Sequence, residues 1–436
     1  MLALYTLLWY VALPFLPMRL WWRARREPGY REHIGERYGR YRSHAGALRG
    51  PVLWVHAVSL GETRAAAPLV DRLKRAYPEA TVLVTHMTAT GRAAGRELFG
   101  DRVVQAWLPY DVPFAIRSFL AHFRPRAGLV METELWPNLL ALARGAGVPV
   151  FLVNARMSAR SAAGYARVAS LTRPMLASLA GVAAQAEVDA ERLSALGATA
   201  PVVTGNLKFD VRIGNEARAL GSEFRVRFGE TRPVWVAGST RDGEEALILD
   251  ALAAQPLPPG TLTVIVPRHP QRFAAVADLL RQRGVPFVRR SDNAAVPTDT
   301  NVVLGDSMGE LAGYYAAADV VFIGGSLLPL GGQNLIEPIA AGRPTIVGPH
   351  MFNFAEAAEK ALAAGAALQV ADARALLAEV AALLGDAGRR DAMREAALAF
   401  HAAHRGSADR LWAWLEPRLA AAVRNAPAPG RGNLSP

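Results

Sequence analysis

The chain contains no cysteine, and this absence excludes several kinds of chemistry at once. It rules out disulfides, zinc sites with thiolate ligands and catalysis by a thiol nucleophile. The acidic motifs described below also lack an accompanying Asp-x-Asp pair or histidine cluster, which are the patterns typical of metal sites. We therefore expect any site built on these motifs to work without a metal ion.

The chain has fewer acidic than basic residues, with 38 Asp and Glu against 49 Lys and Arg, so its net charge is +11. Such an excess attracts nucleic acid, acidic lipid or a phosphorylated substrate. The arginines gather beside an apolar N-terminal stretch, with eight of them between Arg19 and Arg42. No basic-aromatic pattern typical of nucleic-acid binding appears, so we expect a membrane surface rather than nucleic acid as the partner.

Residues 1–18 carry no charge and come close to the roughly 20 residues that span a bilayer. They lack a basic region and a small-residue cleavage site, so we do not expect a signal peptide that is removed. Trp21 and Trp22 lie where an aromatic belt would lie, followed by arginines. Residues 1–22 are therefore predicted to be a single membrane anchor. Pro14 and Pro17 would weaken a spanning helix, so a helix in the membrane plane is an alternative, and a buried core helix is another.

Short apolar runs alternate with helical stretches along both halves of the chain, beginning with 51–56 in the first half and 234–237 in the second. This alternation predicts parallel β-α-β units and an α/β fold. The length of 436 residues suits two domains. We expect two doubly wound, Rossmann-like domains that face each other across a cleft.

The pattern is interrupted after residue 205, where we place the domain boundary. The expected organisation is an anchor over 1–22, an N-terminal domain over 23–205, a linker over 206–231, a C-terminal domain over 232–405, a closing helix over 406–424 and a disordered tail over 425–436.

Glu62 follows the first predicted strand of the N-terminal domain, together with Ser59 and Gly61. A carboxylate at the carboxyl end of a strand can act as a general base on a substrate hydroxyl, and Gly61 permits close approach of the backbone. The spacing Ser59-x-x-Glu62 is also that of a capping box, which needs no catalytic function. The two interpretations are compatible, and both stay open.

Glu132 and Glu134 follow a later strand and precede a helix opened by Pro137. Together with Glu62 they could orient the hydroxyls of a sugar. Alternatively, Glu134 favours the helix dipole and Glu132 pairs with an arginine. Arg156 and Lys208 end two further strands, where they could hold a phosphate or carboxylate, although each alone is more often a surface charge.

The most specific motif is the run 324–338, which lies between two apolar strand-like segments and contains four glycines. Glycine lets the backbone approach a ligand, and the N–H groups at the start of the following helix favour an anion. Glu337 suits a pair of ribose hydroxyls. No Gly-Lys-Ser/Thr follows and the glycine spacing is not that of a dinucleotide fold, so the run predicts a nucleotide-sugar pocket rather than ATP hydrolysis or nicotinamide chemistry.

Three other strand ends in the second half carry polar groups. Ser239 and Thr240 offer hydroxyls to an anion or cap a helix. Arg268 and His269 suit a phosphodiester leaving group. The turn 306–311 has the pattern of a capping box, and it could also present backbone groups to a base or ribose.

Taken in order, these motifs resemble those of the 3-deoxy-D-manno-octulosonic acid (Kdo) transferase family of lipopolysaccharide assembly. The resemblance runs from about Met1 to His404 and rests on residues 36–39, 56–62, 131–138, 205–210, 238–241, 267–270, 306–311 and 324–338. It implies an inverting, metal-independent transferase of the two-domain GT-B type without a cofactor. The implied donor is CMP-Kdo, the implied acceptor is the lipid A precursor lipid IVA, and the implied location is the cytoplasmic face of a bacterial inner membrane.

The resemblance also assigns roles, beginning with Glu62 as the general base. The residues expected in the acceptor and sugar region are Glu36, Arg37, Ser59, Gly61, Glu132, Glu134, Arg156 and Lys208. The residues expected in the CMP-binding region are Ser239, Thr240, Arg268, His269, Ser307, Met308, Gly309, Glu310, Gly332, Asn334 and Glu337.

Many UDP-sugar transferases have paired glutamates eight residues apart, whereas here Pro329 stands eight residues before Glu337. This departure fits a CMP donor. The alternatives are a membrane-associated GT-B enzyme with a UDP-sugar donor and a non-enzymatic anchored protein that binds nucleotide or lipid.

Overall fold

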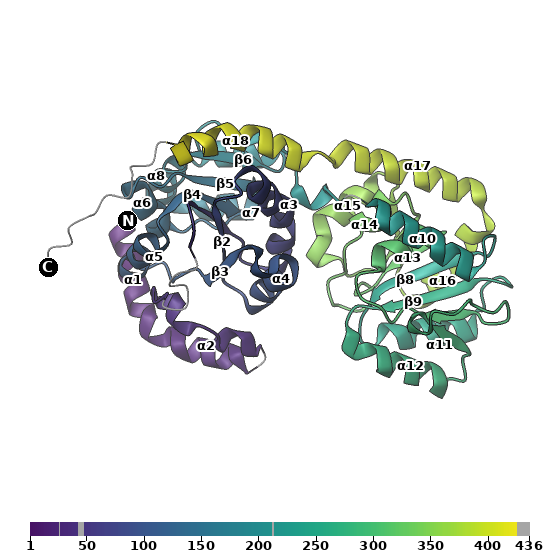
Figure 1. Ribbon diagram of the computed structural model, residues 1–436. Coiled ribbons are helices and arrows are strands. Elements are labelled where there is room, and N and C mark those ends of the chain that lie inside the picture. The colour runs from purple at the N-terminus through teal and green to yellow at the C-terminus, as the bar shows by residue number, and fades with distance from the viewer. Residues whose placement is uncertain (26, 42–47, 212, 425–436) are drawn as a thin grey trace. The chain divides into compact units, whose positions relative to one another are not determined.

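The computed structural model describes residues 1–25, 27–41, 48–211 and 213–424, so the tail expected over 425–436 lies outside the described residues. The chain forms two compact units, which we treat separately (Figure 1). The first unit contains Met1–Asp210 and Gly406–Pro436, and the second contains Val211–Arg405.

The first unit is built on a parallel sheet of seven strands in the order β3-β2-β1-β4-β5-β6-β7. The strands are β1 (Val52–His56), β2 (Thr81–His86), β3 (Val104–Trp107), β4 (Pro125–Met131), β5 (Val150–Ala155), β6 (Gly181–Ala184) and β7 (Val202–Val203). Helices cover both faces, so the central strands are buried on both sides and read as continuous apolar runs. The predicted doubly wound α/β fold is confirmed here.

The helices of this unit are α3 (Leu60–Ala76), α4 (Ala89–Phe99), α5 (Pro113–Phe123), α6 (Pro137–Gly145), α7 (Ala159–Arg167), α8 (Ala169–Ala177), α9 (Glu187–Ala195) and α18 (Ser407–Arg424), with 3-10 turns at Gly100–Arg102 and Leu207–Phe209. Side chains of α5, α6, α8 and α9 pack in one core cluster, and those of α3 and α18 pack in the other. Helix α18 buries Leu411, Leu415 and Leu419, so this helix packs in the first unit.

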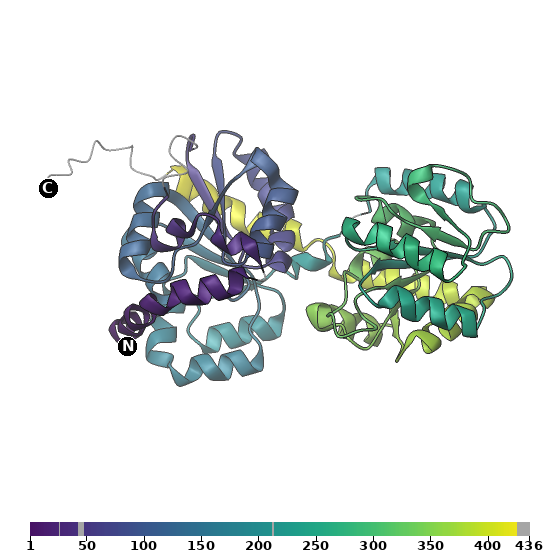
Figure 2. The same cartoon turned by 90° about the horizontal axis from the view of Figure 1, so that it is seen from below.

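The N-terminal segment consists of α1 (Leu2–Ala12), a 3-10 turn at Leu13–Phe15 and α2 (Leu16–Ala24), followed by 3-10 turns at Pro28–Arg31 and Ile34–Tyr38. Among the described residues, Leu2–Ala24 is the one helical stretch long and apolar enough to cross a membrane. Figure 2 shows this segment running along the first unit. Its residues Leu16, Leu20 and Ala24 are buried in a cluster with Tyr30 and Tyr110, whereas most other apolar side chains of the segment are exposed.

The second unit repeats the design with the strand order β10-β11-β9-β8-β12-β13-β14, again all parallel. Its strands are β8 (Val234–Thr240), β9 (Leu262–Pro267), β10 (Phe287–Arg289), β11 (Val302–Leu304), β12 (Val320–Ile323), β13 (Thr345–Val347) and β14 (Ala367–Gln369). The predicted second doubly wound α/β sheet is therefore confirmed as well.

The helices of the second unit are α10 (Asn215–Phe228), α11 (Glu244–Ala254), α12 (Phe273–Gln282), α13 (Leu311–Ala317), α14 (Ile336–Ala340), α15 (Ala355–Ala363), α16 (Ala373–Gly385) and α17 (Ala387–His404), with 3-10 turns at Pro270–Arg272, Arg290–Asp292 and Phe352–Phe354. Helix α10 lies within the segment expected to be a linker. Its Phe224 is fully buried and stacks on Tyr314, with ring centroids 4.5 Å apart, so this segment packs in the second unit.

Each sheet has a point where the strand order reverses, between β1 and β4 in the first unit and between β8 and β12 in the second. In doubly wound sheets, ligands bind beside the carboxyl ends of the strands at this point. Glu62 and Glu132 follow the two strands of the first pair, while Ser239 and the glycine run belong to the ends of the second pair. The topology therefore places the strongest sequence motifs at the expected ligand edge of each unit.

Candidate active site

Glu62 lies in the first turn of α3, and its carboxylate is held by two donors. The N–H of Val58 donates to Oε2 at 2.8 Å, and the Ser59 hydroxyl donates to Oε1 at 2.9 Å. The Ser59 oxygen also accepts from the N–H of Glu62 at 3.4 Å, so Ser59 caps the helix. The predicted N-cap is therefore confirmed, whereas the Glu62 carboxylate accepts from the N–H of Val58 rather than from that of Ser59 as in a complete capping box. The hydrogen bonds from Val58 and Ser59 fix both oxygens of the Glu62 carboxylate beside β1. Glu62 is 8% exposed.

The pKa of Glu62 is raised to about 7, first by burial and then by the negative charges of Glu132 and Glu134. The donors Val58 and Ser59 oppose the shift, because they stabilise the charged form. A carboxyl group that titrates near neutrality can both accept and release a proton under physiological conditions. The three glutamates predicted to act together are therefore close enough to influence one another.

Glu132 directly follows β4 and has a left-handed backbone (φ 54°), which is unusual for a residue other than glycine. Its Oε1 lies 2.8 Å from the Nζ of Lys208. The predicted cationic partner therefore exists, although it is a lysine rather than the arginine we expected. This ion pair brings two of the predicted acceptor-site residues together, from segments that are far apart in sequence.

Glu134 accepts a hydrogen bond from the indole of Trp136 at 3.1 Å, and burial raises the pKa of its carboxyl group. It lines a pocket of about 340 Å³. Tyr5 of α1 and Tyr165 of α7 also line this pocket. The apolar N-terminal helix thus borders the same hollow as a predicted sugar-site carboxylate.

Glu36 and Arg37 are almost completely buried, at 1% and 2% exposed. Glu36 Oε2 accepts from Arg92 at 3.3 Å and from the N–H of Trp107 at 2.8 Å. Arg37 donates to the Met87 carbonyl at 3.1 Å and lies 4.0 Å from the Trp107 ring. These contacts stabilise the first unit, and a role in sugar binding stays a prediction. Arg156 is exposed directly after β5, and its role also stays a prediction.

In the second unit, several cationic groups gather at the carboxyl ends of β8 and β9. Arg268 and His269 follow β9, and the pKa of His269 is lowered by partial burial and by the positive charges of Arg241 and Arg268. No ion pair links the guanidinium of Arg241 or Arg268 to a carboxylate of the described residues. Two uncompensated guanidinium groups at a ligand edge suit an anion. Arg241 was not predicted as a binding residue, although its position directly after a strand is the signal that identified Arg268.

The last two residues of β8 are Ser239 and Thr240, which differ in backbone conformation and in hydrogen bonding. Ser239 has a left-handed backbone (φ 57°), and Thr240 is buried and donates to Glu245 at 2.9 Å. Neither side chain caps α11, whose N-cap residue is Gly243. The capping alternative is therefore wrong for both residues, and their contacts with a donor stay a prediction.

The turn 306–311 does not form the predicted capping box, since α13 has no side-chain cap. The Ser307 hydroxyl instead pairs with the Tyr314 hydroxyl at 2.9 Å, and Glu310 accepts from Arg290 at 2.9 Å. Met308 is exposed and Gly309 has φ 78°, so this turn presents its backbone at the edge of the sheet.

The glycine run is a tightly packed loop between β12 and α14. Gly332 has φ 72°, a conformation that other residues rarely adopt, and a Cβ atom there would lie 2.2 Å from Met351 Sδ, so a larger residue would be strained and would displace the Met351 side chain. Asn334 donates to Glu337 Oε1 at 3.0 Å, which orients that carboxylate. However, α14 has only five residues, so its dipole is small. The N–H groups of Gly325 and Leu327 are bonded to Glu244. These two amides are therefore occupied within the protein, and anion binding at the start of α14 stays a prediction.

Two further features of the described residues bear on the site. No group of three or more His, Cys, Asp or Glu side chains among them could hold a metal ion.

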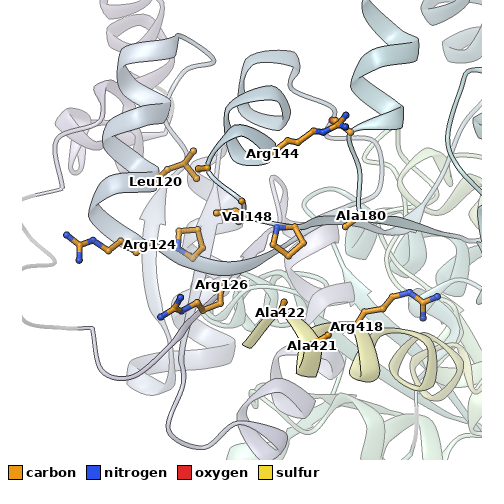
Figure 3. Close-up of a pocket in the computed structure, with 14 residues that line it drawn as sticks. Leu120, Arg124, Arg126, Arg144, Val148, Ala180, Arg418, Ala421 and Ala422 are labelled. Carbon is orange, nitrogen blue, oxygen red and sulfur yellow. The ribbon is translucent and has the colours of Figure 1, made fainter. Parts of the chain in front are cut away.

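A pocket of about 700 Å³ lies at the amino ends of the strands of the first sheet (Figure 3). It contains Arg124, Arg126, Arg144 and Arg418, but none of the predicted site residues. Arg124 and Arg144 lie at the carboxyl ends of α5 and α6, where positive charge offsets the helix dipole.

Comparisons with known proteins bear on the family and the fold of this chain. Residues 32–211 match the family model described as 3-deoxy-D-manno-octulosonic-acid transferase (kdotransferase). A 3-deoxy-D-manno-octulosonic acid transferase of Bordetella pertussis is 48% identical over 429 residues, covering 96% of this chain and 99% of the relative. One from Haemophilus influenzae is 37% identical over 421 residues, covering 95% and 98%. Anabaena Alr3699/HepE, solved in complex with UDP, has a TM-score of 0.54 at 15% identity over 85% of this chain and 100% of that chain, a likeness that shows the fold alone.

Proposed function

This chain belongs to the family of 3-deoxy-D-manno-octulosonic acid transferases, and from that premise we propose that it transfers Kdo from CMP-Kdo to lipid IVA, with inversion and without a metal ion. Membership makes it a glycosyltransferase. The donor, the acceptor and the stereochemistry belong to the proposal.

The observation that carries the proposal is the environment of Glu62. Its carboxylate is oriented by two hydrogen bonds at the carboxyl end of β1, and its pKa is raised to about 7. In the proposed reaction Glu62 takes the proton of an acceptor hydroxyl while that oxygen forms a bond to the anomeric carbon of Kdo. The bond from this carbon to the phosphate oxygen of CMP breaks, and CMP leaves with the bonding pair. A single displacement of this kind inverts the configuration.

The leaving CMP needs stabilisation of its phosphate charge. We propose that Arg241 and Arg268 supply it, since both guanidinium groups lie at the carboxyl edge of the second sheet without a carboxylate partner among the described residues. Preorganised cations at the site of developing charge lower the barrier without a metal ion. The turn 307–310 and the pair Asn334 and Glu337 are proposed to contact the nucleoside.

The acceptor is proposed to lie against the pocket of Glu134, Tyr5 and Tyr165. Lys208, which pairs with Glu132 in this structure, is proposed to bind one of the acceptor's phosphates. This position is supported by the apolar helix α1, because an acylated acceptor reaches the enzyme from a membrane. We propose that α1 and α2 attach the protein to the cytoplasmic face of a bacterial inner membrane.

The way α2 packs favours attachment in the membrane plane. One face of α2 buries Leu16 and Leu20 against the first unit, while Met18, Trp21 and Trp22 are more than half exposed. A helix that must keep one face on a water-soluble domain cannot be surrounded by lipid, whereas an interfacial helix needs one apolar face only.

Mass spectrometry of the reaction product tests the proposed function. Purified protein incubated with CMP-Kdo and tetra-acylated lipid IVA should give products heavier by whole Kdo residues, with one CMP released for each. A rise in melting temperature with UDP and none with CMP would instead identify a UDP-sugar transferase.

A further inference from the structure

Glu244 is a completely buried glutamate at the start of α11, directly after the turn that ends β8. Its Oε2 accepts from the N–H of Arg241 at 2.9 Å and from the N–H of Gly325 at 2.5 Å, and its Oε1 accepts from the N–H of Leu327 at 2.9 Å. One carboxylate thus joins the turn after β8 to the glycine loop after β12. These two segments flank the point where the strand order reverses.

The opposite side of the same loop is also fixed. Ser326 is fully buried, donates to the carbonyl of Ile323 and accepts from the N–H of Gly348 at 2.8 Å. Its carbonyl accepts from the N–H of His350 at 3.0 Å. Residues 325–327 are therefore held between α11 on one side and the end of β13 on the other.

We propose that Glu244 is a positioning residue that shapes the donor site, an inference that rests on the proposed function. It does so by holding the glycine loop and the backbone of Arg241 in one arrangement. The loop carries Gly332 on towards Asn334 and Glu337, and Arg241 is one of the two uncompensated cations. Glu244 itself cannot touch the donor, because it has no exposed surface.

The chemistry of a carboxylate is what this position requires. Three backbone N–H groups converge on it, and only a group with two acceptor oxygens satisfies all of them. Glutamine offers one oxygen and replaces the other by an NH₂ group, which would face N–H donors. The variant Glu244→Gln keeps the size of the side chain while leaving at least one buried donor unsatisfied, so the loop must move.

Asp319 provides a matched control in the same unit. Its Oδ2 accepts from the N–H of Val234 at 2.9 Å and pairs with Arg225 at 3.2 Å, at the amino ends of β8 and β12. The variant Asp319→Asn therefore removes a carboxylate that serves the same sheet at its opposite edge. It should lower stability without a direct effect on the loop.

The test combines hydrogen exchange of the loop 324–332 with calorimetric measurement of CMP binding. Glu244→Gln should speed exchange of this loop and weaken CMP binding about tenfold or more, the effect of losing a hydrogen bond to a charged group. Asp319→Asn should leave both quantities near their wild-type values.

Wild-type exchange rates in the loop of Glu244→Gln, or equal losses of CMP affinity in both variants, would overturn the proposal. If the wild-type protein binds no CMP, the proposed function fails, and the exchange rates alone then decide whether Glu244 holds the loop.

Discussion

Glu62 and Glu244 occupy equivalent places in the two units, since each lies at the start of the helix that follows the first strand of its sheet. Their surroundings differ. Glu62 has two local donors, keeps a small exposed surface and has a pKa raised to about 7, whereas Glu244 has no exposed surface and is bonded to N–H groups from two loops. The comparison teaches that position in the fold alone does not define a catalytic carboxylate. The number of donors and access to the ligand edge decide whether the group can exchange a proton or serves as a fixed anchor.

The largest effect that separates the two carboxylates is expected when Glu62 is replaced by glutamine. Glu62→Gln keeps the size and removes the base, so kcat should fall about 10²- to 10⁴-fold while CMP affinity changes little. Glu244→Gln should instead weaken CMP binding more than it lowers kcat. Steady-state kinetics together with calorimetry measure both. Glu79→Gln, an exposed glutamate of the first unit, serves as the control and should match the wild type. Full turnover in Glu62→Gln would remove its role as base.

Glu62 and Glu244 belong to separately packed units, and α18 packs in the unit of Glu62. Leu415 of α18 is fully buried, so Leu415→Ala should cost about 2–5 kcal/mol of unfolding free energy, with faster hydrogen exchange confined to the first unit. Denaturant titration with exchange measurements would show this. Leu398→Ala on α17 replaces an exposed leucine and should have little effect. Equal loss of protection in both units would contradict the assignment.

The two units also differ in that, among the described residues, only the first has a helix apolar enough to cross a membrane. Replacing Trp21 and Trp22 together by alanine should weaken binding to vesicles of anionic phospholipid by about tenfold or more, because exposed aromatic side chains anchor a helix at the interface. Vesicle sedimentation measures the change. Phe352→Ala replaces an equally exposed aromatic residue of the second unit and should leave vesicle binding unchanged. Equal binding by all three proteins would argue against this attachment site.

The smallest expected effect concerns the charges around Glu62. Glu132 is one of the groups that raise the pKa of Glu62, so Glu132→Gln should lower that pKa and move the acidic limb of the rate profile to lower pH. The shift should be less than about one unit, because burial is the larger cause. Rates measured across the pH range would detect it. A shift to higher pH would contradict the prediction, because Glu132→Gln removes a negative charge and leaves the Lys208 cation unneutralised, and both changes favour the ionised form of Glu62.

The sequence predicted the sheets well because buried parallel strands are continuous apolar runs, as in Val52–His56 and Val320–Ile323. It missed β3 and β14, which are short and include Gln105 and Gln369, so they give no such signal. It treated α10 as part of a linker because the helix is largely polar, and the packing of Phe224 depends on the distant Tyr314. The predicted fold class followed from local patterns, whereas these elements depend on contacts with distant parts of the chain.

A position at the ligand edge of a sheet was predictable for Arg268, which directly follows β9, and for Glu62, which lies in the first turn of the helix after β1. The roles of both residues stay predictions. The raised pKa of Glu62 was not predictable, since it depends on burial and on glutamates about seventy residues further along the chain. Nor was the proposed role of Glu244, whose partners Gly325 and Leu327 lie 81 and 83 residues further along the chain. Charge, burial and hydrogen bonding across strands are properties of the folded chain.

The most direct test of the central claim is the pH dependence of the single-turnover rate of the wild-type protein with CMP-Kdo and lipid IVA. If Glu62 is the base, the rate should rise about tenfold per pH unit below the pKa of about 7 and level off above it, since only the ionised carboxylate accepts a proton. A rate that stays constant from about pH 5 to about pH 9 would contradict the account.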